Sequence, residues 1–216
     1  MISLPRPRPD DKVLEGSYAR LEPLRVPHAE HLYAASAGAD NRSRFDYLFE
    51  DPPRNLADME AWISKVSMSR DPLYFAVIDC ASGRCEGRQA LMRVTPEHGV
   101  IEAGSIYWGP AIARTRVATE ALYLHLCYAF DTLGYRRFEW KCNDRNEPSK
   151  RAARRFGFTF EGLFRQHMVI KGGNRDTAWF SIIDNEWPAI RAAFKAWLTR
   201  GSFDAAGRQR APLETR

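Results

Sequence analysis

The residues best suited to chemistry lie where a predicted strand meets a predicted helix. The strand ends near Trp108, Gly109-Pro110 interrupts it, and residues 111–118 lead directly into an apolar helix. The first backbone N–H groups of a helix have no partner within it, and the helix dipole adds partial positive charge, so such a start binds anions. Arg114 and Arg116 supply side-chain charge at the same place. This turn predicts a phosphate or pyrophosphate site; the alternative is an ordinary connection with solvated arginines.

Positive charge is concentrated in the second half of the chain. The formal net charge is +5, but residues 136–175 hold eleven Lys or Arg and four Asp or Glu, so that stretch carries +7 and the remainder −2. A basic surface can face nucleic acid, an acidic protein or the phosphates of a cofactor, and it can equally be a solvated face. Nucleic-acid binding is disfavoured, because no nucleic-acid-binding motif accompanies the charge.

Composition indicates a globular domain without a metal centre. Of the 216 residues 44% are hydrophobic, and no apolar run approaches the roughly 18–20 residues that a membrane span needs. Residues 1–9 lack the apolar core of a signal peptide, which predicts a cytoplasmic protein without a membrane partner. The cysteines, Cys80, Cys85, Cys127 and Cys142, include no CxxC pair, so neither zinc nor structural disulfides are expected.

Hydrophobic periodicity predicts the order of the elements that position this turn. Strands are expected at 18–24, 73–79, 86–95, 100–108, 138–142, 159–165 and 177–183, and helices at 27–37, 56–68, 118–133, 146–157 and from 185. The consecutive strands joined by short turns predict an antiparallel sheet, and the strand–helix–strand unit predicts a crossover. We expect an extended lead-in at 1–16, one domain at 17–200 and a disordered tail at 201–216.

Five segments in this order resemble the GNAT acetyltransferase superfamily. They are Ala118-Thr-Glu-Ala121, Asn146-x-x-Ser149, Gly157-Phe158, Glu161-Gly162 with Arg165, and Asp176-Thr-Ala-Trp179. The likeness is closest to the ribosomal-protein N-terminal acetyltransferase branch, the RimJ/RimL-like enzymes, and it covers residues 18–187. The phosphate turn departs from the usual Gln/Arg-x-x-Gly-x-Gly/Ala pattern, because those positions read Ala113, Arg116 and Ala118. An arginine in place of glycine restricts how closely the backbone approaches a pyrophosphate.

The resemblance implies an α/β (α+β) GNAT fold, with a mixed, mostly antiparallel sheet of about six to seven strands flanked by helices. It also implies acetyl-CoA as the co-substrate, and no metal. The residues expected to bind acetyl-CoA are Ile112, Ala113, Arg114, Thr115, Arg116, Val117, Ala118, Thr119, Asn146 and Ser149. A main-chain amide near Ile112 or in the strand 105–109 is expected to polarise the thioester carbonyl. Many relatives place a tyrosine near the leaving thiolate where this chain has Ala153, so Ser149 is the expected substitute; its plainer alternative is helix-start hydrogen bonding.

Three residues are candidates for accepting the proton of the attacking ammonium. Glu102 lies on the strand leading to the turn, where a carboxylate can order a water molecule that faces the amine. His167 titrates in a useful range, and Glu161 is a third choice. Each has a plainer alternative, a strand-surface charge for Glu102 and a satisfied or exposed histidine for His167. Ordered water alone is also compatible with the family.

The predicted reaction is direct transfer of an acetyl group to a primary amine, because no serine or cysteine has an obvious partner base for an acyl-enzyme. A protein N-terminus is the first expected acceptor, with a small-molecule or antibiotic amine or a lysine side chain as alternatives. A non-catalytic acyl-CoA-binding module is a further alternative. The aromatic loop 45–49 and the hairpin tip 171–175 are expected to line the acceptor groove of a monomer or homodimer.

Overall fold

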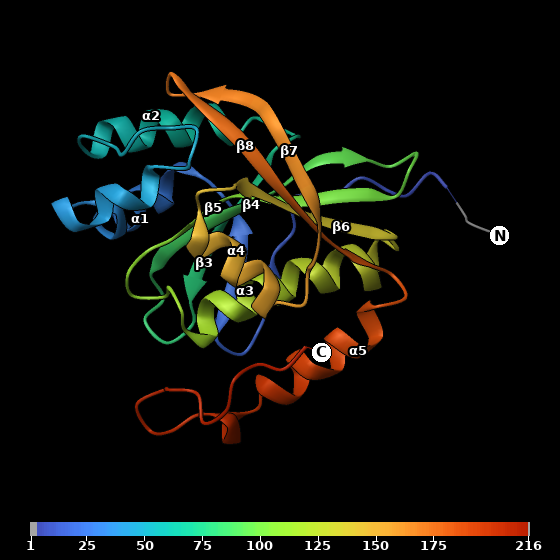
Figure 1. The fold of residues 1–216 in the computed structure, drawn as a ribbon. Coiled ribbons are helices and arrows are strands. Elements are labelled where there is room, and N and C mark those ends of the chain that lie inside the picture. Colours follow the sequence, from blue (N-terminus) through green and yellow to red (C-terminus); the bar gives the residue numbers. More distant parts are fainter. Residues whose placement is uncertain (1–3, 216) are drawn as a thin grey trace.

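An eight-stranded sheet organises residues 4–215, the part of the chain that the computed structural model describes (Figure 1). The strand order is β1–β2–β3–β4–β5–β6–β8–β7. The strands are Leu14–Glu15 (β1), Ala19–Pro23 (β2), Leu73–Asp79 (β3), Cys85–Thr95 (β4), Val100–Trp108 (β5), Arg137–Asn143 (β6), Thr159–Ile170 (β7) and Gly173–Ile183 (β8). Every neighbouring pair is antiparallel except β5 and β6, which are parallel. The predicted mixed, mostly antiparallel sheet is confirmed, and the short β1 adds a strand to it.

Helices cover both faces of this sheet. The α-helices are Ala29–Ser36 (α1), Leu56–Val66 (α2), Arg116–Cys127 (α3), Glu147–Arg155 (α4) and Trp187–Trp197 (α5). Short helical turns are Val26–His28 (η1), Ala39–Phe45 (η2), Tyr128–Thr132 (η3) and Arg200–Ser202 (η4). Figure 1 shows α1 and α2 on one side of the sheet and α3, α4 and α5 on the other. Among the residues described, no helix is both long and apolar enough to cross a membrane.

The two faces of the sheet build two hydrophobic cores. In β3, Phe75 and Val77 belong to the larger core, which also holds buried side chains of α3 and α5. Ala76 and Ile78, between and after them, belong to the smaller core with buried residues of α1 and α2. Because successive side chains of a strand point to opposite faces, a continuous apolar run such as β3 is buried on both sides.

Strands β5 and β6 stay paired over only part of their length. Val100–Ala103 pairs with Arg137–Trp140, and no pairing continues beyond it. On its other side β5 is bulged: Arg88 pairs with Tyr107 and Ala90 with Gly104, so two residues of β5 face one of β4. A bulge bends a strand and raises its local twist. The carboxyl ends of β5 and β6 therefore diverge, and the chain passes from them into α3 and α4.

The segments at both ends of the described residues contact the domain. Phe203 and Leu213 are buried in the larger core, and the Trp197 indole N–H donates to the Ala211 carbonyl at 3.0 Å. Near the amino terminus, the Asp10 backbone N–H donates to the Tyr128 hydroxyl at 2.9 Å. The sequence pattern predicted an extended lead-in and a disordered tail here, because single apolar residues in a polar segment show no periodicity.

Candidate active site

The turn before α3 has the geometry of an anion site. Thr115 caps the helix, since its Oγ1 accepts from the Val117 N–H at 3.2 Å and donates to the Ile112 carbonyl at 2.7 Å. Within residues 4–215, the backbone N–H groups of Arg114, Arg116 and Ala118 donate to no protein acceptor. Free amides at a helix start are the groups that bind phosphate. The predicted turn thus presents unsatisfied donors even without the glycines of the usual pattern.

Several residues predicted to bind the cofactor have buried side chains, so only their backbone groups could contact it. The side chains of Ile112, Val117 and Ala118 are buried. The amides of Ile112 and Ala113 both donate to the Gly109 carbonyl, at 3.1 and 2.9 Å, so they close the turn. The Ile112 amide, one of the groups predicted to polarise the thioester carbonyl, is therefore already engaged within the turn.

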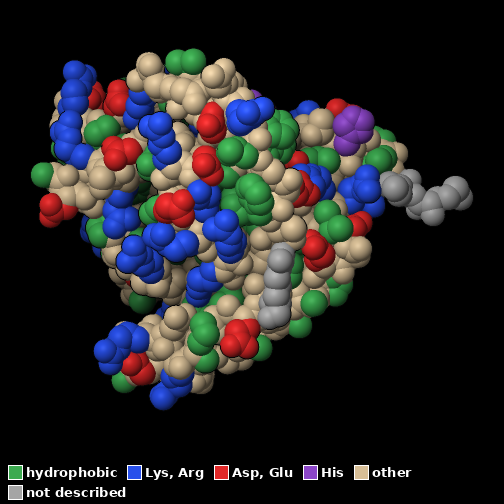
Figure 2. Space-filling view, viewed as in Figure 1, with side chains coloured by type: hydrophobic (Ala, Val, Ile, Leu, Met, Phe, Trp, Pro, Cys, Tyr) green, Lys and Arg blue, Asp and Glu red, His purple; other side chains and the backbone are tan. Residues whose placement is uncertain are grey.

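The cations around this turn differ from those the sequence suggested. The Arg116 guanidinium lies over the Tyr18 ring at 4.4 Å and near the Phe203 ring at 5.3 Å, so it ties the tail to α3. Arg114 is exposed. Arg155 of α4 reaches the start of α3, where its Nη1 donates to Thr119 Oγ1 at 3.1 Å. No described carboxylate pairs with Arg155, whose pKa burial lowers. Figure 2 shows Lys and Arg side chains gathered over the face that carries α4.

A cavity of about 120 Å³ lies where β5 and β6 diverge. Its walls come from the bulged part of β5, the end of β6, the start of α4 and the aromatic loop, and they include Glu102, Asn146 and Ser149. Asn146 caps α4 by accepting from the Ser149 N–H at 3.1 Å. The Trp140 indole N–H donates to Ser149 Oγ at 2.9 Å, and the Ser149 side chain also hydrogen-bonds Cys142. Three of the predicted site residues therefore line the same cavity. Glu102 and Ser149 are candidate catalytic residues, and Asn146 is a predicted cofactor residue.

Glu102 is a paired, buried carboxylate. Its side chain is 3% exposed, and it accepts from Arg93 Nη1 at 2.8 and 2.9 Å and lies 2.8 Å from Lys141 Nζ. Lys141 also lies 2.6 Å from Glu139. Burying one charge is costly, whereas alternating charges satisfy one another. Glu102 therefore forms ion pairs with two cations, Arg93 and Lys141, that line the cavity together with it.

The other two candidates for the proton acceptor, Glu161 and His167, lie in different surroundings. Glu161 pairs with Arg137 and accepts from Ser181 Oγ at 2.7 Å, and it is not among the residues that line the cavity. His167 does not line the cavity either, but its Nδ1 lies 3.0 Å from Thr177 Oγ1, which accepts from the lining residue Arg175. Burial lowers the pKa of His167, and the nearby cations Arg175, Arg93 and Lys141 lower it further. A neutral imidazole at pH 7 can accept a proton.

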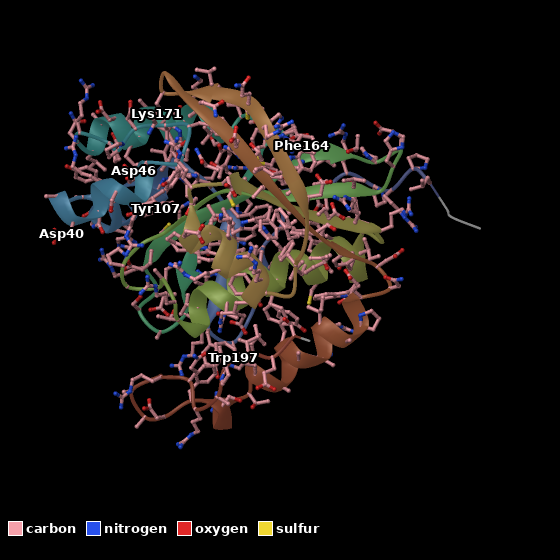
Figure 3. All side chains as sticks on the ribbon, in the orientation of Figure 1. Asp40, Asp46, Tyr107, Phe164, Lys171 and Trp197 are labelled. Atoms are coloured by element: carbon pink, nitrogen blue, oxygen red, sulfur yellow. The ribbon has the colours of Figure 1, made fainter. Side chains whose placement is uncertain are left out.

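The two segments predicted to line the acceptor groove contact each other. Lys171, at the tip of the β7–β8 hairpin, donates through Nζ to the carbonyls of Phe45 and Glu50 at 3.0 Å each. Figure 3 shows Lys171 above Asp46, at the end of η2. Tyr47 in the same loop donates to the Arg145 carbonyl at 3.1 Å. The loop thus spans the opening between the hairpin and the start of α4.

A buried arginine that sequence reasoning missed supports the bulge of β5. Arg88 is 3% exposed, forms an ion pair with Glu50, and donates to Ser105 Oγ at 2.7 Å. The Tyr74 hydroxyl lies 3.1 Å from the same Ser105 oxygen. Burial lowers the pKa of Arg88 to about 9. A second cavity, of about 400 Å³, opens beside Arg88 between α1, α2 and residues 50–54. The alternating pattern of this strand does not predict which of its charged residues is buried.

No cluster of three or more His, Cys, Asp or Glu side chains suited to a metal ion occurs among the described residues.

Comparisons with known proteins agree with this geometry. Residues 19–159 match the family model described as the acetyltransferase (GNAT) domain, so the chain belongs to the GNAT acetyltransferase family. The structure is similar to a GCN5-related N-acetyltransferase from Brucella melitensis, with a TM-score of 0.95 and 58% identity over 98% of this chain and 96% of that one. A probable acetyltransferase from Chromobacterium violaceum has a TM-score of 0.78 and 38% identity, over 85% and 91% of the two chains. An uncharacterized N-acetyltransferase p20 from Bacillus licheniformis is 27% identical over 60% of this chain and 72% of its own.

Proposed function

We propose that the protein transfers an acetyl group from acetyl-CoA directly to a primary amine. The observation that carries the proposal is the cavity between the diverging ends of β5 and β6, beside the start of α4. A thioester placed there is reachable from the acceptor groove, while its phosphates lie toward the free amides of the α3 turn. Holding two reactants in this way converts a bimolecular step into an effectively unimolecular one.

The chain's own residues fit acetyl-CoA at this place. The amides of Arg114, Arg116 and Ala118 would take the pyrophosphate, and the unpaired Arg155 adds a cation beside them. Asn146, already a helix cap, would also meet the pantetheine amides. When bound, acetyl-CoA supplies the activated acetyl group.

Each chemical task has a candidate residue. Ser149 is the candidate donor to the departing thiolate: its oxygen accepts from Trp140, so its hydroxyl hydrogen, which now faces Cys142, can turn to donate. The main-chain amides around Ser105–Ile106, where the bulge disturbs regular pairing, would polarise the carbonyl. His167 is the better proton acceptor, since Glu102 is bound to two cations.

The preferred acceptor in this proposal is a protein N-terminus, as in the RimJ/RimL-like branch that the sequence resembles. A small-molecule amine is the second candidate, favoured by the contacts through which Lys171 joins the hairpin tip to the loop over the groove.

The test is thiol release from acetyl-CoA over a panel of peptide and small-molecule amines, comparing the wild-type protein with Ser149→Ala. We expect Ser149→Ala to lower kcat by about 10- to 100-fold with little change in the affinity for acetyl-CoA. Ser64→Ala, on an exposed part of α2, is the matched control and should be unchanged.

Equal rates in the wild type and Ser149→Ala would remove Ser149 from the mechanism. Tight acetyl-CoA binding by calorimetry without turnover of any amine would instead favour a non-catalytic acyl-CoA-binding module.

A further inference from the structure

Arg175 of β8 is a buried cation without a carboxylate partner. Its side chain belongs to a residue that is 6% exposed, and it lines the cavity at the end of β5 and β6. Among residues 4–215 its one hydrogen bond runs from Nε to Thr177 Oγ1 at 3.0 Å, and its guanidinium lies 5.8 Å from the Phe49 ring. The two Nη groups are left without an acceptor. These Nη atoms are not among the fully buried donors that lack a partner, so they remain open to an acceptor that enters the cavity.

The surroundings of Arg175 are positive. The cavity is lined by four cationic side chains, Arg44, Arg93, Lys141 and Arg175, and by one carboxylate, Glu102. Glu102 is already shared between Arg93 and Lys141. No carboxylate that lines the cavity remains to neutralise Arg175. The same positive field contributes to the lowered pKa of His167.

The direction of Arg175 follows from the alternation of β8. Ala178, Phe180 and Ile182 point into the larger core under α3 and α5. Arg175, an odd-numbered residue of the same strand, therefore faces the other side of the sheet, where the acceptor must approach. Thr177 Oγ1 joins it to the candidate base, because that oxygen accepts from Arg175 Nε and lies 3.0 Å from His167 Nδ1.

We propose that Arg175 binds an anionic group of the acceptor, so that the preferred substrates are primary amines that carry a carboxylate or phosphate close to the amine. This inference rests on the proposed acetyltransferase function. A guanidinium presents paired donors that match a carboxylate or phosphate. Binding the anion at Arg175 sets the neighbouring amine beside His167. A positive groove also repels acceptors that carry only an ammonium group, which gives discrimination by rejection as well as by attraction.

The experiment compares matched acceptors that differ in one acidic group. The pairs are Asp-Ala-Ala amide and Asn-Ala-Ala amide, glycine and glycinamide, and phosphoethanolamine and ethanolamine. We expect kcat/KM for the acidic member to exceed that of its partner by about 10- to 100-fold in at least one pair. The pair that shows this preference identifies the anionic group that Arg175 binds: a peptide side-chain carboxylate, an α-carboxylate or a phosphate.

The preference should depend on Arg175 itself. Arg175→Gln is expected to bring the ratio within about threefold of unity, while Arg175→Lys retains part of it. Arg165→Gln, an exposed change on β7, is the control that keeps the ratio. If Arg175→Gln does not fold, the wild-type protein still gives an answer: succinate should inhibit competitively against the amine and succinamide should not.

Several results would overturn the inference. Equal rates within every pair, or faster reaction of the neutral members, would refute it while leaving the acetyltransferase function intact. Loss of acetyl-CoA affinity in Arg175→Gln with an unchanged acid-to-neutral ratio would assign Arg175 to the co-substrate instead. Absence of turnover with every amine would remove both proposals.

Discussion

Acidification should weaken the link between α3 and the sheet, because His125 of α3 is buried as a neutral base. His125 is 0% exposed and packs edge-on against Phe75. Its Nδ1 lies 3.1 Å from Gln89 Nε2, and Gln89 Oε1 accepts from the Trp108 indole N–H at 3.1 Å. Burial lowers the pKa of His125 to about 3. The network thus joins α3 to the end of β5, on either side of the turn.

The magnitude follows from the difference between the folded and unfolded pKa of His125. Between pH 6.5 and 3 the unfolded chain binds a proton that the folded chain does not, so stability falls as the pH falls. The loss is about 1.4 kcal/mol per pH unit, or roughly 3 kcal/mol in the free energy of unfolding between pH 6.5 and 4.5.

Urea unfolding at pH 7 and at pH 4.5 measures this loss. His125→Phe, which cannot take up the proton, should lose roughly 3 kcal/mol less on acidification than the wild type. His98→Gln, at an exposed position, is the control and should behave as the wild type. The reasoning fails if His125→Phe and the wild type lose the same free energy of unfolding on acidification.

Three further changes test other parts of the site. His167→Gln should lower kcat/KM at pH 7 by about 100-fold, with acetyl-CoA affinity by calorimetry unchanged; a wild-type pH profile would exclude His167 as the base. Lys171→Met removes the contacts between the hairpin tip and residues 45–50, so chymotrypsin should cleave that aromatic loop faster, and KM for the amine should rise severalfold; an unchanged cleavage rate would show that the contacts do not hold the loop. Phe203→Ala should cost about 3–5 kcal/mol in the free energy of unfolding, and an unchanged Tm would argue against a packed tail.

The sequence was a good guide to elements whose pattern is strongly periodic. The alternation in 138–142 and the apolar helix that follows the turn both predicted real elements, β6 and α3. The helix was expected to run to 133, whereas α3 ends at Cys127 and continues as the π-helical turn η3. Periodicity does not distinguish the two, since both bury one side of a helical turn.

The sequence could not predict which charged residues of the site form ion pairs and which do not. The basic segment 136–175 was visible, but its members have different surroundings: Lys141 is paired with two carboxylates, whereas Arg175 has none. Which partner a charge meets depends on strand register and on the bulges of β4 and β5, and neither is encoded in local composition. The sequence predicts that the aromatic loop and the hairpin tip line one groove. Their contact through Lys171 depends on how β7 and β8 curve, which local sequence does not specify.

Two arginines without a carboxylate partner, Arg155 and Arg175, lie where the proposed reaction needs positive charge. On the floor of the groove Arg93, Glu102, Lys141 and Glu139 alternate in sign, so their burial is compensated. Arg155 and Arg175 have no such compensation. Arg155 adjoins the α3 turn on the side of the larger core, and Arg175 faces the groove on the other side of the sheet. Arginines without a carboxylate partner on both sides of the β5–β6 opening suit a protein that receives two anionic reactants from opposite faces and joins them between the strands.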